Sequence, residues 1–344
     1  MLARSMDLTT SVLNGDRLSL SRLLTQIEKD SDQGRKALND LFPHTGRAHL
    51  IGVTGAPGTG KSSLTNQLAK HYRNPPEGEP RTVAIVAVDP SSPFSGGAVL
   101  GDRIRMQDLA GDPGVFIRSM ATRGSLGGLA AATAGLVQAL DAAGYEIIFI
   151  ETVGAGQSEV EVAKLAHTTL VVEAPGLGDD IQAIKAGILE IADILVLNKA
   201  DRSGVEAAER ALRGMLKLGH PIERSFTHHG RIEEVEVPSA ESEDETIWIP
   251  PLLRTVATEE QGIPELAAAI AEHRAFLENS GEFERRERAR LESEVDDLLR
   301  ATMMNRWRDQ TPDTHYTAII DDILARKLSP RQAVAKLLNG RSSK

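Results

Sequence analysis

The chain has 344 residues, of which 41% are hydrophobic, enough for one large α/β domain with additions or for two domains. Its formal net charge of −10 leaves no broad basic surface for DNA or RNA, and its aromatic content of 3% disfavours modules that stack bases on Phe and Tyr. The lack of cysteine excludes disulfides, Cys-ligated zinc and iron–sulfur clusters.

The N-terminal residues contain no signal-peptide core, and no apolar run approaches the ~20 residues that a membrane-spanning helix needs. We therefore expect a cytoplasmic protein that binds neither nucleic acid nor membranes. The first 46 residues are predicted to form a separate helical extension. After an expected helix start at Asp16, apolar residues recur at helical spacing, namely Leu20, Leu23, Leu24 and Ile27.

Residues 47–275 alternate between short β-branched runs and helix-like stretches. The predicted strands are 50–54, 82–88, 115–119, 147–151, 169–173, 194–198 and 252–258. The predicted helices include 62–72, 126–143, 205–218 and one that starts at Pro264. Runs that are apolar on both faces and alternate with helices are typical of a buried parallel sheet. The fold class is therefore predicted to be α/β, with a mostly parallel central sheet flanked by helices.

The remaining residues, 276–344, are strongly charged at first and then carry amphipathic helices, including one that starts at Ser329 and Pro330. Apolar stripes on terminal helices pack either on the body of the same chain or on a second subunit. The sequence alone leaves both possibilities open for this C-terminal helical arm.

The stretch GAPGTGKSS (55–63) fits the pattern Gly-x-x-x-x-Gly-Lys-Ser between a strand and a helix. Its glycines let backbone N–H groups turn inward onto phosphate oxygens, and the helix N-terminus adds its dipole. We expect Lys61 to reach the β- and γ-phosphates and Ser62 to bind Mg²⁺. The predicted phosphate-binding residues are Gly55, Ala56, Pro57, Gly58, Thr59, Gly60, Lys61, Ser62 and Ser63.

The stretch NKAD (198–201), placed at the end of a strand, predicts recognition of guanine. A carboxylate at Asp201 can accept from both N1–H and the exocyclic amine of guanine, whereas adenine would leave that charge unpaired. We expect Asn198 to hold the loop and reach the ring edge, and the stem of Lys199 to cover the base. The loop that contains Ala257 is a second candidate clamp.

Two carboxylates at strand ends are candidate Mg²⁺ ligands. Asp89 ends a strand that we expect to lie beside the P-loop, although Asp-Pro-Ser-Ser is also good turn chemistry. Glu151 stands where many nucleotide switches have Asp, and its longer side chain can act through a water or in the outer shell of the metal. Gln157 comes two positions later than in those switches, so no local residue clearly orients the attacking water.

Three glycine-rich loops are candidate switches. In the first, Asp102 could swing toward the γ-phosphate, as a metal ligand or catalytic residue. In the second, Gly154 can offer its N–H to that phosphate. The third, 175–187, either closes on the nucleotide through Lys185 or simply begins a helix. We expect Lys61, Asp102, Glu151 and Lys185 to be the catalytic residues.

Six motifs in order make the chain resemble the MeaB/ArgK family, which includes the methylmalonic aciduria type A protein. They are GAPGTGKSS, VDPSSPFSGGAVLGDRIRM, RSMATRGSLGGLA, ETVGAGQSE, PGLGDDIQAIKAGI and NKAD. The resemblance runs nearly end to end, and it implies a homodimeric P-loop GTPase with a C-terminal helical dimerisation arm.

The family's activity implies GTP, GDP and Mg²⁺ as ligands and an adenosylcobalamin-dependent mutase, chiefly methylmalonyl-CoA mutase, as the partner. The resemblance further implies that GTP gates the loading of the cofactor and that the mutase orders the loops of Asp102 and Lys185. A metal-insertion GTPase, a kinase for amino-acid transport and an interaction protein with a degenerate nucleotide site are the alternatives. The lack of Cys argues against the metal-insertion GTPase, and the NKAD motif argues against an ATP-dependent kinase. The intact Lys61-Ser62 pair argues against a degenerate nucleotide site.

Overall fold

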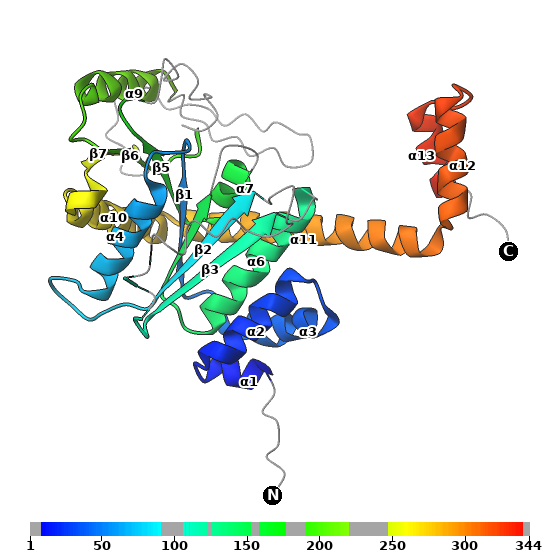
Figure 1. The fold of residues 1–344 in the computed structure, drawn as a ribbon, viewed down its shortest axis with the longest axis horizontal. Helices are drawn as coiled ribbons and strands as arrows, with labels where there is room; N and C mark the ends of the chain where they lie inside the picture. Colours follow the sequence, from blue (N-terminus) through cyan, green and yellow to red (C-terminus); the bar gives the residue numbers. More distant parts are fainter. Residues whose placement is uncertain are drawn as a thin grey trace, which may run out of the picture. The chain divides into compact units, whose positions relative to one another are not determined.

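The computed structural model describes residues 8–90, 106, 108–109, 111–122, 126–152, 158–176, 190–219 and 247–339 (Figure 1). The contacts within the chain divide it into two compact units, Met1–Leu291 and Glu292–Lys344. In the described part of the chain, no helix combines the length and the apolar character needed to cross a bilayer.

The strands of the described residues belong to the first unit: β1 (His49–Thr54), β2 (Val83–Pro90), β3 (Val115–Thr122), β4 (Ile147–Thr152), β5 (Thr168–Glu173), β6 (Ile194–Asn198) and β7 (Leu252–Thr255). The helices of this unit are α1 (Leu8–Leu13), α2 (Arg17–Glu28), α3 (Asp32–Leu41), η1 (Phe42–His44), α4 (Lys61–Arg73), α6 (Leu126–Ala142), α7 (Ser158–Leu165), α9 (Val205–Gly219), η3 (Ala257–Glu259) and α10 (Ile263–Ser280). Helix α11 (Glu282–Gln310) continues into the second unit, which also holds α12 (Asp313–Leu324) and α13 (Pro330–Asn339).

The seven strands form one sheet in the order β3-β2-β4-β1-β5-β6-β7, and every neighbouring pair is parallel. The predicted parallel sheet is therefore confirmed. The expectation that the strand of Asp89 lies beside the P-loop strand is wrong, because β4 pairs with both β1 and β2 and separates them. The strand that delivers Glu151 is the direct neighbour of β1.

Successive residues of each central strand enter different cores, as the two-residue period of a strand requires. In β1, Leu50 belongs to the core under the N-terminal helices and α6, while Ile51 belongs to the core under α4 and α10. In β2, Ala84 and Ile85 divide in the same way. Figure 1 shows these helices on opposite faces of the sheet. Burial on both faces explains why the strands read as continuous apolar runs.

The N-terminal helices pack on α6. The carboxylate of Asp16 accepts from the N–H groups of Leu18 and Ser19, which confirms the predicted helix start. A Cβ on Gly135 of α6 would lie 2.9 Å from Cγ2 of Ile27, so this glycine allows α2 and α6 to approach closely. The extension is therefore part of the first compact unit.

Buried polar groups attach the start of α11 to the amino ends of β5 and β6. Asp193, 1% exposed, accepts from the backbone N–H of Thr169 at 2.8 Å and from both terminal nitrogens of Arg286 at 2.9 and 3.0 Å. His167 lies 2.8 Å from Glu287. Burial acts to raise the pKa of Glu287, but hydrogen bonds from His167 and Arg290 outweigh it and lower the pKa to about 2.

In the second unit, α12 packs on α13, and the indole N–H of Trp307 donates to the carbonyl of Leu337 at 3.4 Å. The side chains of Ile319 and Ala333 are buried. Helix α13 begins at Pro330, as the sequence predicts, and the hydroxyl of Ser329 accepts from the N–H of Gln332 at 3.3 Å. The structure describes every residue of α11, and none of them is buried.

Candidate functional site

The loop between β1 and α4 is held in a shape that only glycine can supply at two positions. Gly55 has φ +132°, and a Cβ there would lie 2.1 Å from the carbonyl oxygen of Val172. Gly60 has φ +96°, and its Cβ would lie 2.4 Å from the amide nitrogen of Asn198. Both the backbone angle and the neighbouring atoms therefore exclude a side chain. The loop is pressed against the ends of two further strands, β5 and β6.

Replacement of Gly55 by alanine is expected to lower the free energy of unfolding by about 2–4 kcal/mol, because the new methyl group meets backbone rather than a movable side chain. Chemical denaturation measures this change. Gly144→Ala is the matched control, since its φ is +90° but no atom lies within 4 Å of the added Cβ. The control should lose only about 1 kcal/mol from the left-handed backbone. Equal losses of unfolding free energy in both variants would show that the close approach of Val172 to Gly55 does not contribute to stability.

Lys61, 6% exposed, curls back over the loop at the first position of α4. Its ammonium donates to the carbonyl of Gly55 at 2.7 Å and to that of Ala56 at 3.2 Å. Together with the N–H groups at the start of α4, this ammonium supplies positive charge that can attract an anion to the helix N-terminus. Ser63, the last residue of the predicted phosphate loop, is half-buried in the first turn of the helix.

Ser62 and Glu151 meet beside this loop. The hydroxyl of Ser62 donates to a carboxylate oxygen of Glu151 at 2.5 Å, and both side chains are buried. Hydroxyl and carboxylate oxygens are the ligands that Mg²⁺ prefers, so this pair fits the metal. Among the described residues, no three His, Asp or Glu side chains are grouped so that they could hold a metal ion. An Mg²⁺ here would therefore also take oxygens from phosphate and water.

Asn198 ties three segments together. Its amide nitrogen donates to the carbonyl of Thr59 at 2.8 Å, and its amide oxygen accepts from the hydroxyl of Thr255 at 3.1 Å and from the N–H of Ala257 at 3.2 Å. The side chain is 1% exposed. The asparagine of the NKAD motif thus joins the phosphate loop to the loop that follows β7, which places Ala257 at the same site.

Two further residues of the NKAD motif lie toward solvent. Lys199 has φ +58°, and its ammonium donates to the carbonyl of Gly58 at 2.6 Å, so its stem crosses the space between the two loops. Burial, followed by the charge of Arg202, lowers the pKa of Lys199. Asp201 is exposed in the turn that follows. Its carboxylate can therefore accept from a base that lies against Lys199.

A second carboxylate, which no sequence motif singled out, lies near the phosphate loop. Glu173 ends β5, next to Val172, whose carbonyl contacts Gly55. Burial raises the pKa of Glu173 to about 7, although the charge of Lys61 acts to lower it, and Glu159 adds a smaller rise. The only sequence signal was a Glu at the end of an apolar run, the same signal that singled out Glu151.

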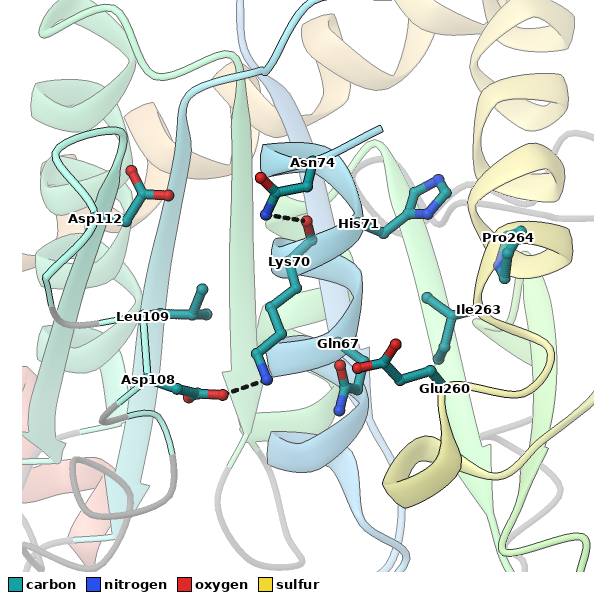
Figure 2. A pocket seen from close by; sticks show the side chains of 10 residues that line it. All are labelled: Gln67, Lys70, His71, Asn74, Asp108, Leu109, Asp112, Glu260, Ile263 and Pro264. Atoms are coloured by element: carbon teal, nitrogen blue, oxygen red, sulfur yellow. Dashed lines mark hydrogen bonds and ion pairs between the residues drawn. The ribbon is translucent and has the colours of Figure 1, made fainter. Parts of the chain in front are cut away.

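A pocket of about 420 Å³ lies along the outer side of α4, where Figure 2 shows Lys70 paired with Asp108. Its lining residues are Gln67, Lys70, His71, Asn74, Asp108, Leu109, Asp112, Glu260, Ile263 and Pro264. None of these belongs to the predicted nucleotide site. The amide of Asn66 also donates to Asp108 at 3.4 Å, so two side chains of α4 hold this aspartate.

Several predicted site residues fall outside what the structure describes. Asp102, Gly154 and Lys185 lie in segments that are not described, and of Asp89 only the backbone is described, as part of β2. The described residues bring together the phosphate loop, Glu151, Asn198, Lys199 and Ala257.

A family model described as "Methylmalonyl Co-A mutase-associated GTPase MeaB" matches residues 20–312. A Pyrococcus abyssi protein is 42% identical over 332 residues, which cover 96% of this chain and 95% of the relative. The GTPase ArgK of Escherichia coli is 32% identical over 334 residues, which cover 94% of this chain and 92% of ArgK.

Among solved structures, the crystal structure of an LAO/AO transport system kinase is similar, with a TM-score of 0.69 over 100% of both chains. Its sequence is 24% identical, so the likeness shows the fold alone. The α/β P-loop architecture with helical additions at both ends is thereby confirmed. The transport role that this name carries is said of the other protein alone.

Proposed function

The chain belongs to the MeaB family of methylmalonyl-CoA mutase-associated GTPases, and we propose that its GTP state gates the loading of adenosylcobalamin into an acyl-CoA mutase. The mutase of this proposal is methylmalonyl-CoA mutase, which the family description names. The GTPase protects the mutase or reactivates it by ejecting damaged cofactor. The nucleotide chemistry is supported best by the contacts at the phosphate loop. There the ammonium of Lys61 donates to the carbonyl of Gly55, and the hydroxyl of Ser62 donates to Glu151.

In the proposed site, the backbone N–H groups of residues 55–63 surround the phosphates of GTP or GDP. Lys61 leaves the carbonyls of Gly55 and Ala56 and pairs with the β- and γ-phosphate oxygens, where negative charge is spread in the transition state. Ser62 and Glu151 would hold Mg²⁺ with Asp89 and Asp102, and a bound metal would supply positive charge to the phosphates. The protein thus acts by placing positive charge against the phosphates.

We propose that the attacking water is oriented by the loops of Asp102 and Lys185, which become ordered when a partner binds. Gln157 lies two positions later than in switches that use an adjacent Gln, so intrinsic hydrolysis should be slow. We propose that the mutase brings Asp102 and Lys185 to the γ-phosphate, against which Gly154 offers its N–H. Asp102→Ala and Lys185→Ala should each abolish mutase-stimulated turnover while nucleotide affinity is retained. Stimulation that survives both changes would show that these loops have no such role.

Guanine recognition is assigned to Asn198, Lys199, Asp201 and the backbone at Ala257. Asp201→Ala should weaken GTP binding about 10–100-fold, because it removes an ionised acceptor worth roughly 1.5–3 kcal/mol. Competition of unlabelled GTP and ATP against a fluorescent guanine nucleotide measures the change. ATP, against whose base this carboxylate stays unpaired, should bind weakly to the unchanged protein and no more weakly to the variant. An ATP-dependent kinase would instead show tight ATP binding in the unchanged protein.

A metal-insertion GTPase is the second candidate. It would need Cys or His groups to hold the cargo ion, and the chain has no cysteine. Equilibrium dialysis of the purified protein against Ni²⁺ and Zn²⁺ addresses this candidate directly. Tight binding of either ion would favour it over the mutase assignment.

We propose that the second unit forms a homodimer. Along α11, Val295, Leu298, Leu299 and Met303 share one side of the helix at i, i+3, i+4 and i+8, and each is about half exposed or more. An exposed apolar stripe of this length is typical of an interaction surface. A second copy of the same chain supplies a complementary stripe, as closed two-fold dimers do.

The double change Leu298→Glu and Met303→Glu should convert the dimer into a monomer of 37.1 kDa, because it buries two charges in the apolar contact. Light scattering after size exclusion gives the mass. Ala301→Glu adds a charge on the other side of the same helix and should leave the dimer intact. A monomer already in the unchanged protein would refute the proposed arm function.

The gating proposal is tested on the mutase. Mutase whose cofactor has been damaged should regain activity with fresh adenosylcobalamin, GTP and this protein, but not when GDP replaces GTP. Recovery that proceeds equally with GDP would contradict a GTP-dependent gate.

A further inference from the structure

Strand β1, which leads into the phosphate loop, lies between two strands that both carry a glutamate at or near their carboxyl ends. On one side, β4 pairs Glu151 with Val53, and this glutamate binds Ser62. On the other side, β5 pairs Val171 with Thr54, so Glu173 comes two residues beyond that pair and beside the loop itself. The proposed GTPase mechanism uses the first glutamate and leaves the second without a role.

Among the described residues, the charged groups that act on Glu173 come from α4 and α7. Lys61 stands at the start of α4, and Glu159 lies in the first turn of α7. On the side of β5 away from β1, the neighbouring strand β6 pairs the uncharged Leu197 with Glu173. Glu173 is half-buried, so its ionised form is costly, and among the described residues Lys61 attracts that charge and Glu159 repels it.

Arrival of a nucleotide changes this balance in one direction. Its phosphates add negative charge beside the loop, which disfavours a second anion at Glu173. They also attract the ammonium of Lys61, which donates to the carbonyls of Gly55 and Ala56 and whose charge favours the ionised carboxylate. Both effects favour the protonated carboxyl.

We propose that Glu173 is a nucleotide-linked proton acceptor of the phosphate site, which takes one proton from solvent as the phosphates bind and returns it when they leave. One O–H bond forms on the carboxylate, and no bond of the nucleotide breaks. The neutral carboxyl no longer competes with the phosphates for the charge of Lys61, so Glu173 acts as a positioning residue. The inference rests on the proposed nucleotide site and adds a regulation to it.

The expected effect is measurable because burial places the pKa of Glu173 at about 7. At pH 8 the free carboxyl is about 90% ionised, so uptake of roughly 0.3–0.7 proton per bound nucleotide is expected. Around pH 8 the dissociation constant should then rise about two- to fivefold per pH unit.

Isothermal titration with Mg²⁺ and GDP at pH 8, in Hepes and in Tris, tests the inference. The two buffers differ in heat of ionisation, so the difference in binding heat gives the number of protons taken up. GDP avoids hydrolysis, and its terminal phosphate, with a pKa of about 6, is already ionised. Glu173→Gln mimics the neutral carboxyl and should bind without uptake and with a pH-independent affinity. Glu272→Gln, the same change on the exposed side of α10, is the control and should match the unchanged protein.

Each outcome is decisive. Buffer-dependent heat that disappears only in Glu173→Gln supports the proton acceptor. Binding of GDP with equal heats in both buffers overturns it, and so does uptake that persists in Glu173→Gln, while the nucleotide site itself stands. Failure of GDP and GTP to bind at all would overturn the nucleotide site together with the inference.

Discussion

Asp193→Ala is expected to lower the free energy of unfolding of the first unit by about 3–5 kcal/mol, the usual cost of removing one partner from a buried ion pair. The change leaves the guanidinium of Arg286 without its two carboxylate bonds and the N–H of Thr169 without its acceptor. It also removes the charge that lies 3.4 Å from His273. Urea denaturation followed by circular dichroism measures the loss.

Asp297→Ala is the control for this prediction. Asp297 pairs with Arg300 at 3.3 Å, but the arginine side chain is 76% exposed, and pairs of that kind contribute about 0.5 kcal/mol or less. A loss at Asp193 no larger than the loss at Asp297 would show that the network does not attach α11 to the sheet. The test concerns folding alone, because Asp193 lies at the end of the sheet away from the phosphate loop.

Lys61→Met is expected to reduce GTP turnover by about 10²–10³-fold, the range typical for loss of one group that stabilises transition-state charge. Methionine keeps most of the stem in its buried position and removes only the ammonium that contacts the carbonyls of Gly55 and Ala56. The melting temperature should therefore fall only by the effect of these two lost hydrogen bonds. Phosphate release under saturating GTP, together with nucleotide affinity, separates weaker binding from slower chemistry.

Lys36→Met makes the same change on the exposed side of α3 and should leave turnover unaltered. If Lys61→Met retained turnover within a few-fold of the unchanged protein, the ammonium would have no part in hydrolysis. A fall of the same size in both variants would instead indicate a general effect of lost positive charge.

Local patterns in the sequence predicted much of the fold. The alternation of apolar runs with helical stretches indicated the parallel sheet, and a Gly-x-x-x-x-Gly-Lys-Ser pattern indicated the loop with Lys61 at its helix start. Asp16 was recognisable as a cap because its side chain acts on residues two and three positions later. Such signals are readable because cause and effect lie within a few residues of each other.

Features that depend on contacts between distant segments were not predictable in this way. The order of strands placed β4, rather than β2, beside β1, because pairing depends on the packing of the whole sheet and not on the run itself. Glu173 looked like an ordinary strand end, and only the approach of Val172 to Gly55 shows that it borders the phosphate loop. Asn198 was recognised as part of a motif, but its bond to Thr59 spans 139 positions of the chain.

Turnover of GTP by the purified protein, alone and with the adenosylcobalamin-dependent mutase from the same source, tests the proposed function most directly. We expect slow hydrolysis by the protein alone and a large stimulation by the mutase, which is lost in Lys61→Met. Tight GTP binding with no stimulation by the mutase would contradict the proposed partnership.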